Sequence, residues 1–158
     1  MIAQFAIRLI CGMSLAWCLA SRRQITDGFF RIQMLIVLGL SVLAGLTHLG
    51  GWNSPSSDEV GNPGHPWGIH TDTWLCGATA VAAYIGSFTW ALGRRRFGTV
   101  CIVVITGLSL ALMVQSAWIT NPTSLPMSLM VVASELSTAL LLGAAMVSML
   151  LGHWYLTA

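Results

Sequence analysis

Charge is scarce in this chain of 158 residues. Asp, Glu, Lys and Arg together make up 8% of it, there is no lysine, and the formal net charge is +2. A soluble domain averages about 25% charged residues, which cover its water-facing surface. Because this chain cannot cover such a surface, a lipid bilayer is the predicted solvent for most of it. The small net charge also gives no basis for a nucleic-acid partner.

Motifs for redox, metal and nucleophile chemistry are missing as well. The four cysteines all fall in apolar runs, and neither a CxxC pair nor a CxxCH haem-attachment motif is present. We expect these cysteines to act as small apolar packing residues. No serine is placed by a motif beside a histidine and an acid, so the sequence leaves open whether the protein is an enzyme.

Long apolar runs dominate what remains, and the mean hydropathy is +0.78. About 20 apolar residues in a helix cross a bilayer. The chain contains five such runs, which predict an all-α bundle of five transmembrane helices in one domain, 1–158. The predicted spans are 2–20, 32–49, 73–92, 97–119 and 126–152, with a long outer loop at 50–72. In the first span, Gly12, Ala16 and Ala20 form a stripe of small residues that is typical of a helix-packing face.

The arginines predict the orientation of the bundle. Six of the seven lie in the connections after the first and third spans, and none lies in the connections after the second and fourth. The positive-inside rule then places the N-terminus outside and the C-terminus in the cytoplasm. We expect a multi-pass protein of the inner membrane of a bacterial-type cell.

The C-terminal end of the sequence predicts further polypeptide or a partner subunit beside it. Ala158 follows His153, Trp154 and Tyr155, which resemble an interfacial belt, without any Arg or Lys to mark a cytoplasmic end. We therefore expect the native protein to continue past Ala158, or another membrane subunit to cover this end.

Strongly polar residues also lie inside the apolar spans. Arg8, Gln115 and Glu135 are about 9, 6 and 13 Å from the outer ends of their helices, at 1.5 Å per residue. A charge at such depth costs a few kcal/mol unless it has a partner or a function. Opposite charge and similar depth predict that Arg8 and Glu135 meet, as an ion pair or in a proton relay with Gln115. The alternative is that Arg8 extends outward to the headgroups and Glu135 is protonated.

Histidines flank the long outer loop. His48 and His70 are predicted at the outer ends of the second and third spans, either hydrogen-bonded to loop carbonyls or as the two axial ligands of a b-type haem. His65, His70 and Asp72 form an alternative zinc or copper site. Their spacing matches no standard metal motif, so both cofactor hypotheses rest on residue type and position alone.

Three functions therefore stay open. The first hypothesis is a membrane subunit of a redox or proton-handling complex of the electron-transport type. Its outer-half polar cluster would bind haem b or a quinone, or relay protons, beside other membrane subunits. The second is a structural or assembly subunit without chemistry. The third is a metal-handling or transport protein that uses the loop histidines.

Overall fold

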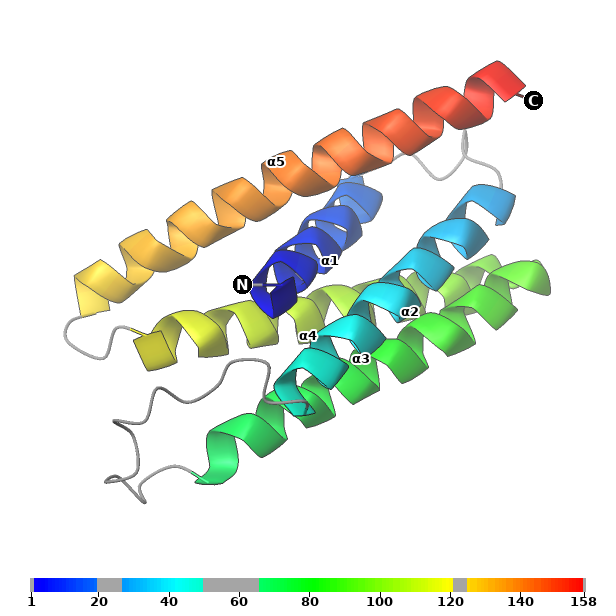
Figure 1. Cartoon of the computed structure of the whole chain (residues 1–158). Coiled ribbons are helices and arrows are strands. Elements are labelled where there is room, and N and C mark those ends of the chain that lie inside the picture. Colours follow the sequence, from blue (N-terminus) through cyan, green and yellow to red (C-terminus); the bar gives the residue numbers. More distant parts are fainter. Residues whose placement is uncertain (1, 20–26, 50–65, 121–124, 158) are drawn as a thin grey trace.

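The computed structural model describes residues 2–19, 27–49, 66–120 and 125–157, and apart from a turn at 92–94 all of them are helical (Figure 1). The helices that it contains are α1 (Ile2–Leu19), α2 (Asp27–Leu49), α3 (Pro66–Ala91), α4 (Arg95–Thr120) and α5 (Leu125–Thr157). The predicted all-α class is therefore confirmed for the part of the chain that is described.

Four of these helices are long and apolar enough to cross a membrane. They are α1, α2, α4 and α5, with apolar stretches at Ile2–Leu19, Gly28–His48, Arg95–Ser116 and Leu129–His153. This composition is compatible with a multi-pass membrane protein. The helix α3 has 26 residues but is not among them, because hydroxyl, small and polar residues interrupt its hydrophobic ones. The fifth span, at 73–92, stays a prediction.

The start of α3 corrects one predicted boundary. Residues 66–72, expected in the outer loop, are helical, because α3 begins at Pro66. Proline favours the first turn of a helix, where its missing N–H would have no helical partner and its fixed φ is already suitable. His70 and Asp72 therefore belong to a helix. Residues 50–65 lie outside the described part of the chain.

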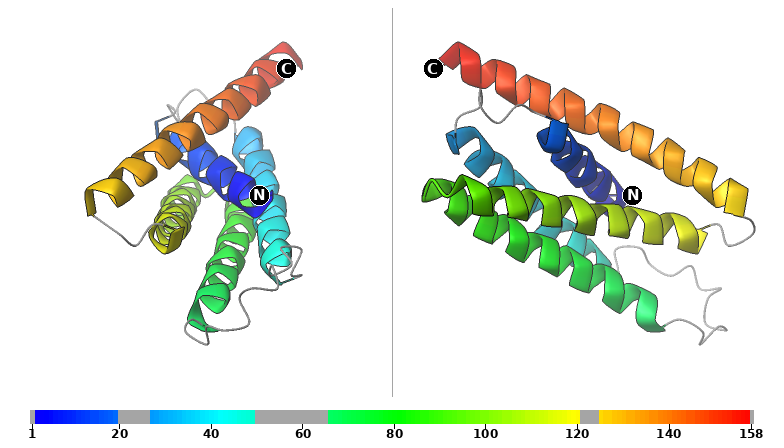
Figure 2. Two further views of the ribbon diagram at one scale, coloured as in Figure 1. Left: turned by 60° about the vertical axis from the view of Figure 1, so that its left-hand side comes forward. Right: turned by 180° about the vertical axis from the view of Figure 1, so that it is seen from behind.

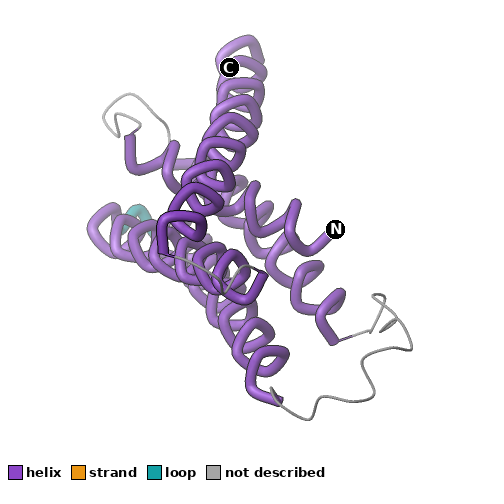
Figure 3. Tube along the Cα trace, turned by 90° about the vertical axis from the view of Figure 1, so that its left-hand side faces the viewer, coloured by secondary structure: helices purple, strands orange, loops and turns teal. Residues whose placement is uncertain are grey.

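The helix α1 occupies the centre of the bundle. It packs against α5, α4 and α2, whereas α3 packs against α2 and α4 (Figures 1 and 2). Its side chains Cys11, Met13 and Trp17 are fully buried. The helix α5 lies over α1 and touches α4 much less (Figure 3). The first and last helices are thus neighbours, as an Arg8–Glu135 contact requires.

Two glycines bring the backbones of α1 and α5 together. A Cβ atom on Gly12 would lie 1.8 Å from the carbonyl oxygen of Ala139, and one on Gly143 would lie 2.0 Å from the carbonyl carbon of Gly12. No side chain fits in this space, so the contact depends on glycine at both positions. The predicted packing face is confirmed at Gly12, and it meets α5.

Candidate functional site

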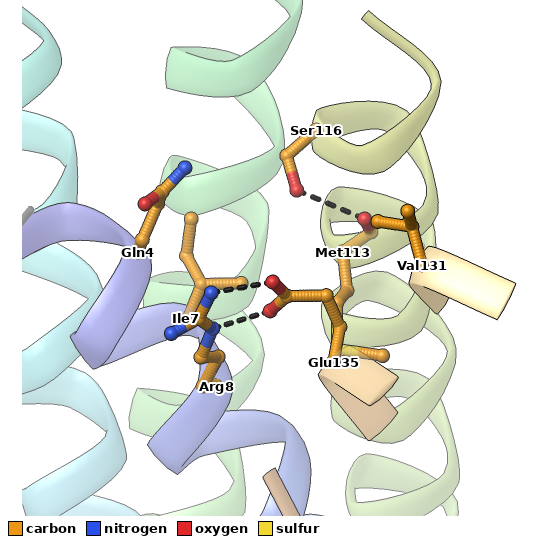
Figure 4. Close-up of a pocket in the computed structure, with 7 residues that line it drawn as sticks. All are labelled: Gln4, Ile7, Arg8, Met113, Ser116, Val131 and Glu135. Atoms are coloured by element: carbon orange, nitrogen blue, oxygen red, sulfur yellow. Dashed lines mark hydrogen bonds and ion pairs between the residues drawn. The ribbon is translucent and has the colours of Figure 1, made fainter. Parts of the chain in front are cut away.

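The ion pair of Arg8 and Glu135 joins residues 127 positions apart in the sequence. The Nε and Nη2 atoms of Arg8 each donate a hydrogen bond to a different carboxylate oxygen of Glu135. Figure 4 shows the guanidinium on α1 turned toward the carboxylate on α5. This two-pronged geometry is the strongest form of arginine–carboxylate contact and fixes the orientation of both groups.

The glycine contact between α1 and α5 positions this pair. Arg8 is four residues before Gly12, and Glu135 is four residues before Ala139, whose carbonyl oxygen faces Gly12. Residues four apart lie on the same face of a helix, one turn from each other. The close backbone contact therefore holds both charged side chains on facing surfaces, one turn away from it.

A small cavity surrounds the pair. Its volume is about 40 Å³, and it is lined by Gln4, Ile7, Arg8, Met113, Ser116, Val131 and Glu135. A water molecule needs about 10–15 Å³ of such space, so the cavity has room for a few waters. The side chains of Arg8 and Glu135 keep 32% and 26% of their exposure, so the pair is neither sealed in the core nor on an open surface.

An apolar layer separates this cavity from deeper polar groups. It is centred on Cys11, Met113 and Ala139, which come from α1, α4 and α5. Beyond it the buried hydroxyls of Ser14 and Ser109 lie 3.4 Å apart. Both also donate to carbonyls of their own helices, so they do not need the cavity as a partner.

Gln115 is not among the residues that line the cavity, whereas the next residue, Ser116, is. Successive residues of a helix point about 100° apart, so depth alone does not determine which of two neighbours faces a given space. Gln4 also lines the cavity and was missed by the sequence analysis. It is four residues before Arg8, and this spacing could have identified it.

His48, near the end of α2, and Asp72, near the start of α3, are close enough to interact electrostatically. The Nε2 atom of His48 and the Oδ1 atom of Asp72 are both buried, without a hydrogen-bond partner in the described part of the chain. Burial raises the pKa of the Asp72 carboxyl, which precedes the predicted span, and the attraction of His48 opposes this shift.

The haem and metal hypotheses are not tested by this geometry. His65 and the side chain of His70 lie outside the described residues. Among the residues that are described, no three His, Cys, Asp or Glu side chains are placed to hold a metal ion. Both cofactor hypotheses therefore stay predictions.

One buried polar side chain was not predicted from the sequence. Gln33 in α2 is 1% exposed, and neither its amide nitrogen nor its amide oxygen has a hydrogen-bond partner within the described ranges. In the sequence it is the second residue of the predicted span 32–49, where a polar side chain is expected at the membrane interface. The rotation of α2 turns it into the bundle instead.

Comparison with known proteins adds no relative: no family model matches the chain, and neither a curated protein nor a solved structure matches it.

Proposed function

We propose that the chain is a multi-pass membrane subunit of a proton-handling complex, and that Glu135 is its proton-exchanging group. The observation that carries the proposal is the Arg8–Glu135 pair in a water-sized cavity between apolar helices. A carboxylate at lipid depth is costly unless it is paired or functional, and residues of this kind mark proton pathways in membrane proteins.

The two side chains would have different roles. Arginine stays protonated in proteins, so Arg8 acts as the fixed counter-ion. Glu135 accepts an excess proton that water carries into the cavity as hydronium, loses its negative charge and loosens its contact with Arg8; return of the proton to water restores the pair. The apolar layer at Cys11, Met113 and Ala139 restricts this exchange to the cavity side. Waters, rather than a porphyrin or quinone ring, suit a cavity of this size.

The proposal includes the finer topology: five spans, the N-terminus outside and the C-terminus in the cytoplasm of a bacterial-type cell. Exposed arginines support it: Arg31 lies near the start of α2, and Arg94, Arg95 and Arg96 lie where the α3–α4 turn leads into α4. The start of α2 and the α3–α4 turn are at the same end of the bundle (Figures 1 and 2). Single cysteines introduced at Ser57 and Arg95 should react with an impermeant reagent from opposite sides. Labelling of both from one side would overturn the topology.

Infrared difference spectroscopy of the protein in nanodiscs tests the proton exchange. We expect a carboxylic acid band that appears as the pH is lowered and is lost in the Glu135→Gln variant. The matched control is Ser137→Ala on the same helix, because the Ser137 hydroxyl is exposed and bonds only to the carbonyl of Ser134 among its described contacts. The control should retain the band. A spectrum of Glu135→Gln identical to that of the wild type would refute the proposal.

A structural role is the second candidate, and the glycine contact one turn from the pair favours it. In this case the pair only sets the register of α1 against α5. The double variant Arg8→Met/Glu135→Met distinguishes the two, because it removes both charges and keeps apolar volume. A structural role predicts that this variant folds and assembles normally and that the wild type shows no carboxylic acid band from Glu135. A proton-exchange role predicts that the band is present in the wild type and is lost in this variant although it folds.

A further inference from the structure

The charge balance of the cavity between α1, α4 and α5 depends on two side chains. Of the described residues that line it, Arg8 and Glu135 are the charged ones, and the others are neutral side chains from the same three helices. Arginine stays protonated, so when Glu135 takes up a proton the cavity changes from neutral to one net positive charge. A net charge at lipid depth is costly. Proton uptake therefore favours the entry of one negative charge.

The same event makes hydrogen-bond donors available. In the charged pair, Nε and Nη2 of Arg8 donate to the two carboxylate oxygens of Glu135. A protonated carboxyl is a weaker acceptor, and its O–H becomes a donor itself. Gln4, one turn before Arg8 on α1, lines the cavity and brings an amide N–H group to it (Figure 4). Ser116 is not needed as a donor, because its hydroxyl donates to the carbonyl of Met113 at 2.9 Å.

The walls and the size of the cavity limit which anion fits. Ile7, Met113 and Val131 are apolar, and charges attract each other more strongly beside apolar walls than in water. The volume of about 40 Å³ has room for a few waters. A chloride ion is only slightly larger than a water molecule, whereas an organic anion such as gluconate is much larger. Gln4 is exposed, so the cavity reaches the surface of the bundle near the start of α1.

We infer that this cavity binds a monovalent anion of chloride size together with the proton, so that Glu135 and the anion alternate as the counter-ion of Arg8. The inference rests on the proton exchange proposed above. With Glu135 charged, the pair is neutral and a second negative charge is repelled. With Glu135 protonated, the anion balances Arg8 and the cavity is neutral again. Proton and anion therefore enter and leave together, without net charge.

The carboxylic acid band of the protein in nanodiscs tests this coupling. Chloride replaces gluconate at constant ionic strength, so that screening does not change. Because chloride favours the protonated form, the pH at which the band is half-developed should rise with chloride, by up to about one pH unit for each tenfold increase. A midpoint that does not change with chloride would overturn the inference and leave the proton exchange intact. Absence of the band would refute the proton exchange and the coupling with it.

The Glu135→Gln variant tests anion binding directly, because its amide is neutral at every pH, like the protonated acid. Chloride should raise the melting temperature of this variant. It should bind about tenfold more tightly than to the wild type at alkaline pH, where the anion has to displace the charged pair.

A second substitution in the Glu135→Gln background identifies the cation that holds the anion. Arg8→Gln should abolish the effect of chloride on the melting temperature. Arg31→Gln is the matched control, because Arg31 is exposed on α2 and is not among the cavity-lining residues; it should keep the effect. No chloride effect in Glu135→Gln, or an effect that survives Arg8→Gln, would overturn the inference. The band experiment decides the question if the Arg8→Gln variant does not fold.

Discussion

Replacement of Gly143 by alanine is the sharpest test of how α1 and α5 pack. A methyl group at this position would meet the carbonyl carbon of Gly12 at 2.0 Å and the amide nitrogen of Met13 at 2.4 Å, where ordinary contacts begin at 3.4 Å. The obstacle is backbone, which cannot rotate away as a flexible side chain can. The two helices must therefore separate by more than 1 Å, or α1 must shift along α5.

The expected loss of stability follows from two opposing effects. Inserting a methyl group into a packed interface costs about 1–3 kcal/mol, and a backbone obstacle places this change at the upper end. Alanine in place of glycine gains back about 1 kcal/mol of helix propensity. We therefore expect a net loss of about 2 kcal/mol for Gly143→Ala, and a similar loss for Gly12→Ala.

Gly152 on the same helix is the control, because a Cβ atom there would have nothing within 4 Å. Gly152→Ala should leave stability unchanged or raise it by up to about 1 kcal/mol. Unfolding by titration with denaturing detergent, followed by circular dichroism, measures all three variants. Equal stability of Gly143→Ala and Gly152→Ala would refute the close contact and, with it, the explanation of how the ion pair is positioned.

Three further predictions concern polar groups. In a double-mutant cycle of Arg8→Met and Glu135→Met, we expect a coupling of about 2 kcal/mol, between the values for exposed and buried pairs; additive losses would mean that the side chains do not interact. Gln33→Leu should raise stability by about 1–3 kcal/mol, because it removes an amide without partners, and a loss in thermal unfolding would show that Gln33 binds something. Burial raises the pKa of Asp72, so the folded state favours the protonated carboxyl over the charged one. The free energy of unfolding therefore falls as the pH rises and Asp72 loses its proton. Asp72→Asn should therefore melt higher than the wild type at alkaline pH, with the difference vanishing below about pH 3.9; a pH-independent difference would contradict this.

The contact between Arg8 and Glu135 could be predicted from the sequence because charge in lipid is an exceptional feature. Few other groups at a similar depth could pair with either charge, so the depth and the sign of the two charges were sufficient to predict the contact. The cavity around them was not predicted, since Gln4 and Ser116 are ordinary polar residues near helix ends. Only the three-dimensional packing of α1, α4 and α5 shows that they share a space.

The facing surfaces of the helices were harder to predict. In a soluble protein, the spacing of apolar residues indicates which side of a helix is buried. Here apolar residues face both the core and the outside: Met34 is fully buried, whereas Leu35, beside it on α2, is 46% exposed. Periodicity therefore carries little information, which explains why the burial of Gln33 was missed. Gly12 was an exception, because a stripe of small residues indicates a packing face by size rather than by polarity.

The position of α5 connects the packing with the proposed chemistry. Few residues of its apolar stretch Leu129–His153 are buried, and its main neighbour is α1. The contact with α1 therefore fixes most of α5, and two of its most specific parts lie one turn apart: the glycine contact, which depends on shape, and the Arg8–Glu135 pair, which depends on charge. Protonation of Glu135 would weaken the second and leave the first intact. A proton taken up in the cavity would thus weaken the attachment of the first half of α5 to α1, while the register between the two helices is kept. A change of charge at Glu135 could in this way alter the position of α5 and affect a molecule that contacts it.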